Sequence, residues 1–204
     1  MTITQKPASP HNYDVGRAGH TVKMIVIHVE DGSESGSAAW FANPGSNVCA
    51  HYGVSSAGAI DQFCDEANTA FHAGNYAINQ TSIGVEHEGQ PRLGPWAPTE
   101  AQLSASAALV ADICKRHGIT PSAQTIVPHS SINPNHHCPG PTWPWARYLG
   151  MVQALLAPQA AHRPSPADQQ TVRLYDPSTN QQVGTGTLIV GTGKVYIAPT
   201  VKHP

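Results

Sequence analysis

Short apolar runs recur through the first 156 residues, with polar turns between them, and they predict the strands of a sheet. The clearest run is Met24-Ile25-Val26-Ile27, which ends at His28 and has the length of a buried central strand. The other predicted strands cover residues 48–55 and 59–63, on either side of the turn Ser56-Ala57-Gly58, and residues 82–88 and 125–127. Residues 1–22 show no such pattern and are predicted to be irregular.

Three segments have the caps and the apolar spacing of helices. Residues 35–43 predict a short helix that the turn Asn43-Pro44-Gly45 ends. The longest predicted helix begins with the capping box of Thr99 and Gln102 and stops at Gly118. Thr142 is predicted to cap a last helix over residues 143–156, with Pro144 in its first turn.

The chain divides into three predicted parts. Residues 1–156 predict a catalytic domain, which is long enough to bury a core without disulfides. Residues 157–170 contain three prolines among Ala and Gln and predict a linker. Residues 171–204 predict a small β appendage, with strands over 171–175, 182–190 and 194–197.

The composition excludes several classes of function. The net charge of the 204 residues is −2 and only 12% of them are charged, so no nucleic-acid surface is predicted. No apolar run reaches the ~18 residues of a membrane span, and residues 1–10 lack the features of a signal peptide. We therefore expect synthesis in a cytoplasm, where the four cysteines are reduced.

Two of these cysteines lie in the predicted hairpin. If its loop is Ser56-Ala57, Cys49 faces Cys64 across the two strands, and a disulfide between them is geometrically feasible. The favoured interpretation is a pair of reduced, buried thiols, and the disulfide stays open as the alternative.

The candidate chemistry begins with His28, at the end of the buried strand. Further along the chain, His129 follows the short strand 125–127, and Cys138 comes directly before the turn Pro139-Gly140. Two imidazoles and one thiolate are donors that zinc prefers, and three protein ligands leave a fourth position open, as in catalytic zinc sites. The alternatives are packing roles for the histidines and a buried free thiol for Cys138.

Three polar residues in apolar surroundings are further candidates. Glu86 lies on a predicted central strand, where burying an unpaired carboxylate is costly, and beside a zinc-activated water it can serve as general base and then as acid. The alternative is a strand-end carboxylate in a salt bridge, and Glu88 lies on the same face. His51 and His72 are candidates for hydrogen bonding to a substrate, although packing is favoured for His51.

Together these residues resemble the zinc-dependent N-acetylmuramoyl-L-alanine amidases of the type-2 amidase and peptidoglycan-recognition family, and are most similar to its phage endolysins. The resemblance covers residues 12–156 and rests on the order and spacing of five motifs. They are Ile25-Val26-Ile27-His28, Ala50-His51-Tyr52-Gly53-Val54-Ser55, Phe71-His72-Ala73-Gly74-Asn75, Asn79-Gln80-Thr81-Ser82-Ile83-Gly84-Val85-Glu86, and His129 with Cys138-Pro139-Gly140.

The resemblance implies an α/β fold with a mixed central β-sheet flanked by helices, and one Zn²⁺. The implied reaction is hydrolysis of the amide between N-acetylmuramic acid and the L-alanine of the stem peptide in bacterial peptidoglycan. The implied zinc ligands are His28, His129 and Cys138, the catalytic residue is Glu86, and the substrate-side histidine is His72. Asn75 and His51 complete the predicted substrate-binding residues. We expect a monomeric phage lysis enzyme, made in the host cytoplasm and released to the cell wall through a holin.

Three positions depart from the family pattern. His136 stands where members with an acidic catalytic residue often have lysine, and we expect it to stabilise the oxyanion. Ala50 stands where some members have tyrosine, so Tyr52 does not inherit that role. Phe71 replaces a more frequent tryptophan and keeps its packing role.

Two other functions stay open at this point. One is a receptor that binds peptidoglycan without cutting it, although such family members usually lack a zinc ligand, notably the cysteine. The other is a cytoplasmic amidase that recycles soluble muropeptides. The C-terminal appendage argues against recycling, because an added module suits a polymeric substrate, and it either binds the cell wall or packs on the catalytic domain.

Overall fold

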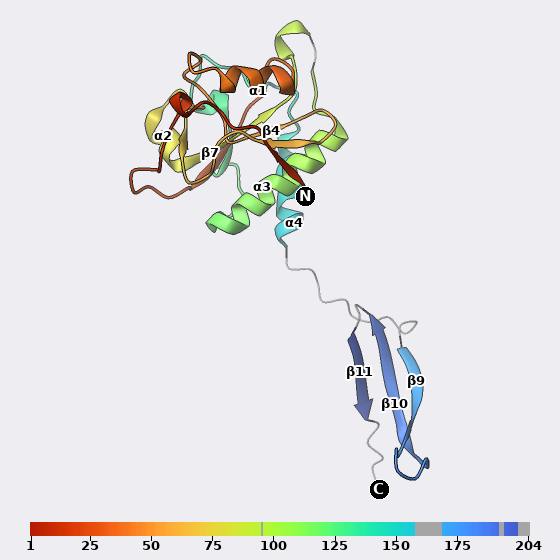
Figure 1. Cartoon of the computed structure of the whole chain (residues 1–204). Helices are drawn as coiled ribbons and strands as arrows, with labels where there is room; N and C mark the ends of the chain where they lie inside the picture. The colour runs from red at the N-terminus through yellow and green to blue at the C-terminus, as the bar shows by residue number, and fades with distance from the viewer. Residues whose placement is uncertain (95, 158–168, 192–193, 200–204) are drawn as a thin grey trace. The chain divides into compact units, whose positions relative to one another are not determined.

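The computed structural model describes residues 1–94, 96–157, 169–191 and 194–199. The chain forms two compact units, Met1–Ala157 and Pro158–Pro204 (Figure 1). Of the predicted linker, residues 158–168 lie outside the described residues. Among the described residues, no helix combines the length and the apolar character that crossing a membrane requires.

A mixed sheet of six strands, in the order β1-β5-β4-β7-β3-β8, forms the centre of the first unit and confirms the predicted fold class. The strands are β1 (Ile3–Gln5), β3 (Met24–Ile27), β4 (Tyr52–Val54), β5 (Ile60–Gln62), β7 (Ser82–His87) and β8 (Ile126–Pro128). The pairs β4–β7, β7–β3, β3–β8 and β1–β5 are parallel, and only β4–β5 is antiparallel. A separate small ladder joins β2 (Tyr13–Asp14) to β6 (Thr69–Ala70).

Helices flank this sheet on both sides, with α1 on the side opposite α3 and α4 (Figure 1). The helices are α1 (Glu34–Ala42), α2 (Tyr76–Thr81), α3 (Glu100–His117) and α4 (Trp145–Leu156), and the short 3₁₀ turns are η1 (Pro10–Asn12), η2 (Pro91–Leu93) and η3 (His129–Ser131). As predicted, the Thr99 hydroxyl caps α3, and Gly118 ends it in the left-handed conformation, with φ of 66°. The predicted capping box is not completed, because the Gln102 side chain donates to the carbonyls of Val54 and Glu88 instead of reaching back to Thr99.

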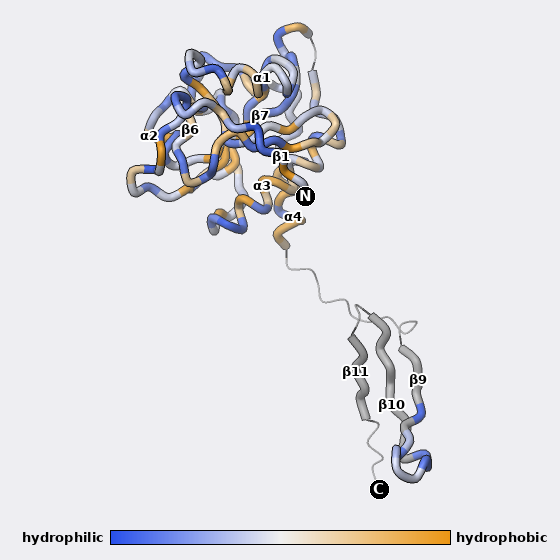
Figure 2. The backbone as a smooth tube through the Cα atoms, viewed as in Figure 1, coloured by the Kyte–Doolittle hydropathy of each residue, from blue (hydrophilic) through white to orange (hydrophobic). Residues whose placement is uncertain are grey.

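The side chains of the central strands β3 and β7 point alternately to the two faces of the sheet. The odd-numbered residues of β3 and β7, among them Ile25, Ile27, Ile83 and Val85, pack into the main core with α3 and α4. Figure 2 shows the hydrophobic segments, in orange, that α3 and α4 contribute to it. Because successive side chains on a strand point to opposite faces, His28 and Glu86 point away from this core. On their side, Phe41 of α1 packs with Phe63 in a smaller apolar cluster.

The hairpin between β4 and β5 differs from its predicted register. Val54 pairs with Ile60 and Tyr52 with Gln62, so the loop has three residues, Ser56-Ala57-Gly58, and not two. Gly58 has φ of 84°, as expected for the glycine that closes a three-residue hairpin loop. Cys49 and Cys64 are therefore not directly opposed, and all four cysteines of the chain are free thiols.

Two other sequence predictions are corrected. Helix α4 begins at Trp145 after Pro144, which supplies no side-chain cap, and the Thr142 hydroxyl instead donates to the Trp96 carbonyl. The segment before β3 is also not irregular throughout, since β1 adds an edge strand to the sheet. In both places contacts between segments far apart in the sequence, which apolar spacing does not reveal, decide the structure.

The second unit contains a three-stranded antiparallel sheet in the order β11-β10-β9. Its strands are β9 (Gln169–Tyr175), β10 (Gln182–Gly191) and β11 (Lys194–Pro199). The turn after β9 is held by Asp176, whose carboxylate accepts from the backbone amides of Ser178 and Thr179.

Candidate metal centre and catalytic site

Three of the predicted site residues occupy one row across the sheet. Ile27 pairs with Val85 on one side and with Pro128 on the other. His28, Glu86 and His129 are the residues that follow these three, so they emerge side by side at the carboxyl ends of three parallel strands. The apolar strands predicted from the sequence therefore bring together side chains that are far apart along the chain.

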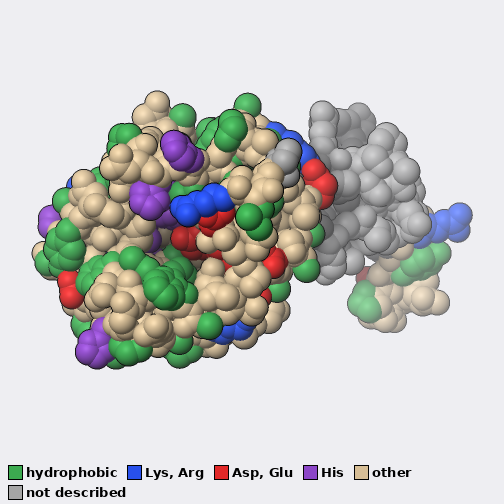
Figure 3. Space-filling view, turned by 90° about the horizontal axis from the view of Figure 1, so that it is seen from above, with side chains coloured by type: hydrophobic (Ala, Val, Ile, Leu, Met, Phe, Trp, Pro, Cys, Tyr) green, Lys and Arg blue, Asp and Glu red, His purple; other side chains and the backbone are tan. Residues whose placement is uncertain are grey.

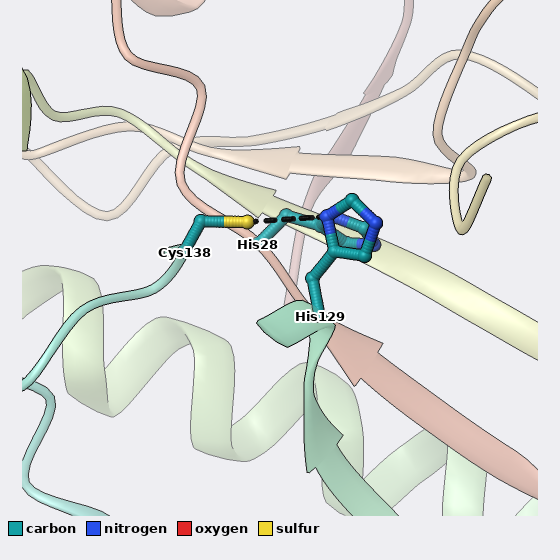
Figure 4. A group of neighbouring side chains, drawn as sticks. All are labelled: His28, His129 and Cys138. Atoms are coloured by element: carbon teal, nitrogen blue, oxygen red, sulfur yellow. Dashed lines mark hydrogen bonds between the residues drawn. The ribbon is translucent and has the colours of Figure 1, made fainter. Parts of the chain in front are cut away.

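His28, His129 and Cys138 converge on one point. Their ligand atoms all lie within 4.8 Å of one another. The Cys138 Sγ lies 3.2 Å from Nδ1 of His129 and 3.9 Å from Nδ1 of His28 (Figure 4). A tetrahedral zinc ion, with bonds of ~2.3 Å to sulfur and ~2.05 Å to nitrogen, requires a sulfur–nitrogen separation of about 3.6 Å. The donor set thus fits zinc in both chemistry and spacing.

The loop that carries Cys138 is held in place by its backbone. The Ser130 amide donates to the Cys138 carbonyl at 3.1 Å, the Cys138–Pro139 peptide bond is cis, and Gly140 has φ of 90°. Burial and the neighbouring Glu86 raise the pKa of the Cys138 thiol to about 12. A bound cation is therefore needed to keep this sulfur as a thiolate at neutral pH.

The histidine donors are neutral bases. His28 is buried, and its burial and the nearby His72 hold its pKa well below the usual range. Burial and then His136 lower the pKa of His129. Both rings therefore keep an unprotonated nitrogen at neutral pH, which is the form that binds metals.

Glu86 lies beside this cluster, with Oε1 3.9 Å from Nδ1 of His28. Its Oε2 is buried and has no hydrogen-bond partner among the described residues. Burial, and then the charge of Glu30, hold the pKa of Glu86 well above its usual range. Burying a carboxyl with an unpartnered oxygen costs free energy, and this one lies beside the converging donors, which favours a functional role for it over a stabilising one.

These side chains line a single cavity of about 520 Å³. The three donors, Glu86 and Glu30 contribute polar groups to its lining, and Phe41, Val48, Phe71, Pro91 and Pro141 contribute apolar ones. In Figure 3 histidines and acidic residues gather around the hollow in this face. The cavity suits a substrate that has both apolar and polar parts.

His136 lies at the cavity, as the sequence prediction requires of an oxyanion donor. Its ring stacks on that of His129, with centroids 4.5 Å apart and an angle of 28° between the planes. The side chain is exposed and lines the cavity. It can therefore reach a bound substrate without displacing the three donors.

The predicted substrate-binding histidines lie deeper than a direct contact with substrate would suggest. His72 borders the cavity, but its ring is bonded on both sides, to His28 and to the Ser82 hydroxyl. His51 is fully buried and is not among the cavity-lining residues. Its ring accepts from the Gly84 amide and contacts the Arg17 guanidinium.

Asn75 and Glu88 have hydrogen-bond partners in their local structure. Asn75 is exposed and caps α2, where its side chain accepts from the Ile78 amide. Glu88, which the sequence hardly separated from Glu86, accepts from the Ser56 amide at 2.7 Å and does not line the cavity. Of the two carboxylates Glu86 and Glu88, Glu86 is therefore the one that lies beside the donors.

Four residues near the site were not singled out from the sequence. Glu30 lines the cavity beside Glu86. Arg17 is buried and donates to the carbonyls of Asn79, Gln80 and Ser82. The Asn79 side chain accepts from the amides of His72 and Ala73. Asn79 and Ser82 lie within one of the resemblance motifs, which was the available signal, but no pattern in the sequence indicated their partners.

Comparison with known proteins identifies the family to which the chain belongs. A family model described as N-acetylmuramoyl-L-alanine amidase matches residues 18–141. N-acetylmuramoyl-L-alanine amidase A of Achromobacter lyticus is 35% identical over 166 residues, which cover 72% of this chain and 90% of that protein.

Solved structures show the same fold. A crystal structure of AmpD is 26% identical with a TM-score of 0.62, over 74% of this chain and 94% of that one. AmiD from E. coli, in complex with anhydro-N-acetylmuramic acid-L-Ala-D-gamma-Glu-L-Lys, is 28% identical with a TM-score of 0.57, over 64% and 57%. The catalytic domain of XlyA, at 20% identity and a TM-score of 0.58, covers 74% and 99% and shares the fold.

Proposed function

Because the chain belongs to the N-acetylmuramoyl-L-alanine amidase family, we propose that it is a zinc-dependent hydrolase that releases the stem peptide from bacterial peptidoglycan. The bond cut is the amide between the lactyl group of N-acetylmuramic acid and L-alanine. The observation that carries this proposal is the convergence of His28, His129 and Cys138 beside the buried Glu86 in one cavity. A receptor that only binds peptidoglycan would not need this donor set.

In the proposed mechanism, His28, His129 and Cys138 would hold the zinc ion, which supplies an activated water at neutral pH and polarises the scissile carbonyl. Glu86 accepts a proton from the attacking water, and His136 donates a hydrogen bond to the oxyanion. Glu86 then delivers that proton to the alanine nitrogen as the C–N bond breaks. The products are a lactyl carboxylate and a stem peptide with a free amino terminus.

The environment of Glu86 suits this double role. Its position near the donors places it within reach of a water that attacks there, and its raised pKa makes it a better base than an exposed glutamate. The same raised pKa allows it to carry the proton through the short interval between attack and bond cleavage.

The direct test is mass spectrometry of purified cell walls after digestion. We expect a new free N-terminal alanine on the stem peptides and no new reducing sugar ends. The reaction should stop after dialysis against a chelator and resume when Zn²⁺ is added back. Cleavage elsewhere in the polymer, or full activity of the metal-free protein, would contradict the proposal.

We favour polymeric cell wall as the substrate, in a phage lysis enzyme that acts as a monomer and reaches the wall through a holin. In this view the second unit holds the enzyme on the wall. The similarity to AmpD and AmiD, the latter solved with a soluble muropeptide, supports a second candidate, an amidase that recycles soluble muropeptides. The ratio of kcat/KM on intact walls to that on a soluble muropeptide distinguishes the two.

A further inference from the structure

We propose that the two-residue segment His72-Ala73 orients both imidazole donors, and that Asn79 and Ser82 fix the segment for this task. The inference rests on the proposed zinc site and assigns to His72 a positioning role, in addition to its place at the cavity edge. It follows from the direction of each hydrogen bond around the two rings.

The first set of bonds runs from Ser82 to His28. The Ser82 hydroxyl donates to the Ile78 carbonyl at 2.6 Å, so its oxygen is left to accept from Nε2–H of His72 at 3.1 Å. His72 then has no proton on Nδ1, which accepts from Nε2–H of His28 at 3.1 Å. His28 is thereby held with its lone pair on Nδ1, the atom that faces Cys138.

The second set is shorter and reaches His129. The Ala73 carbonyl can only accept, so Nε2 of His129, 3.2 Å away, must carry the proton. The lone pair of His129 is therefore also on Nδ1, at 3.2 Å from the Cys138 sulfur. Neighbouring residues of one segment thus set the same tautomer in both donors.

The segment itself is clamped. The Asn79 side-chain oxygen accepts from both backbone amides, at 3.3 Å from His72 and 2.8 Å from Ala73. The His72 ring lies directly against Gly84 of β7, where an added Cβ would come within 2.5 Å of the ring. His72, Ala73 and Asn79 are all buried, so these contacts hold the ring beside His28.

Residues that hold the second nitrogen of a histidine ligand fix its tautomer and orientation, and their loss typically weakens metal binding about 10–100-fold. A side chain that bound only substrate would not affect the affinity of the empty enzyme for metal. Zinc affinity measured without substrate therefore separates the two roles of His72.

The experiment compares zinc dissociation constants, from competition with a chromophoric chelator, for metal-free full-length proteins. His72→Phe keeps a ring but removes the acceptor, whereas His72→Asn places an amide oxygen near the position of Nδ1. Ser82→Ala removes the group that fixes the His72 tautomer, and Ser55→Ala, a buried hydroxyl in the hairpin, is the matched control. Thermal unfolding of each metal-free variant reports on folding.

We expect about 10–100-fold weaker zinc binding for His72→Phe and Ser82→Ala, and near-normal binding for His72→Asn and Ser55→Ala. Unchanged affinity in His72→Phe, or an equal loss in His72→Asn, would overturn the inference while leaving the zinc-dependent reaction intact. If His72→Phe does not fold, Ser82→Ala decides by the same criterion. An unaltered protein that binds no zinc would refute the proposed function itself and the inference with it.

Discussion

Oε1 of Glu86 lies 3.9 Å from Nδ1 of His28, because each residue directly follows a member of the paired positions Ile27 and Val85 of the parallel strands β3 and β7. The two side chains belong to segments that are far apart in the sequence, and the pairing of β3 with β7 brings them together. This pair places the proposed base of the reaction beside a proposed metal ligand.

Glu86→Gln should retain zinc and lose about 10²–10⁴-fold in kcat, because an amide cannot accept the proton of the attacking water. Zinc content and the rate of stem-peptide release are the measurements. Glu88→Gln is the matched control, since Glu88 points to the hairpin and should leave kcat unchanged. A Glu86→Gln enzyme that works at the normal rate would remove this residue from the mechanism.

Cys138→Ser should lower zinc content and activity together, because a hydroxyl is a much poorer zinc ligand than a thiolate. Metal analysis after dialysis, with activity measured on the same samples, tests this. Cys114→Ala, which removes a buried thiol from the core beneath α3, should affect stability only. A fully loaded and active Cys138→Ser protein would refute the ligand assignment.

His136→Ala should reduce kcat by up to ~10²–10³-fold with little change in zinc content, since an oxyanion donor acts on the transition state. His136→Lys should recover much of the loss. Because His137 also lines the cavity, His137→Ala shows what removal of a neighbouring imidazole does by itself. Equal losses in the two alanine variants would argue against a specific role for His136.

The buried His51 should make the metal-free protein sensitive to acid. Burial and then the Arg17 charge lower the pKa of His51 to about 3, whereas in the unfolded chain it is ~6.5. Between these two pKa values only the unfolded state binds the proton. The contribution of His51 to the free energy of unfolding is therefore complete above pH ~6.5, and it decreases by about 1.4 kcal/mol for each pH unit below that value.

Urea unfolding between pH 5 and 7, with a chelator present, measures this slope. His51→Asn should make the slope shallower by about 1.4 kcal/mol per pH unit, while preserving an acceptor for the Gly84 amide. The same substitution at the exposed His20 serves as the control. An identical slope in His51→Asn and the unaltered protein would contradict the assignment.

Removal of residues 158–204 should reduce binding to cell walls and lysis, but leave turnover of a soluble muropeptide intact, because the first unit has its own core and contains the whole cavity. Sedimentation with purified walls measures binding. Undiminished wall binding by the shortened chain would rule out an anchoring role for the second unit.

The sequence was most informative where apolar runs end in reactive residues. His28 and Glu86 were predicted from their positions on buried strands, and the sheet indeed places them in one row. The cap and end of α3 were also predicted, because Thr99 and Gly118 act through local backbone geometry. Such features depend on neighbours in the sequence, and their signals are therefore readable.

Contacts between distant segments were not readable in this way. Asn79 and Ser82 carry no pattern that reveals their bonds to residues 72 and 73, and Arg17 lay in a segment predicted to be irregular. Asn75 was associated with substrate, although its side chain caps a helix of six residues that has too few turns to show an apolar period. The cap by Asn75 is local, whereas the roles of Asn79, Ser82 and Arg17 depend on contacts made in the folded protein, which the sequence pattern does not encode.

The two-faced construction of β3 and β7 has a practical consequence for protein engineering. Replacements at positions 25, 27, 83 and 85 alter the seam with α3 and α4, and are the place to seek heat tolerance. Positions 28, 84 and 86 belong to the proposed site or pack against it and should be kept unchanged in such a search. The parity of residue number thus tells the engineer which positions to vary for durability and which to preserve.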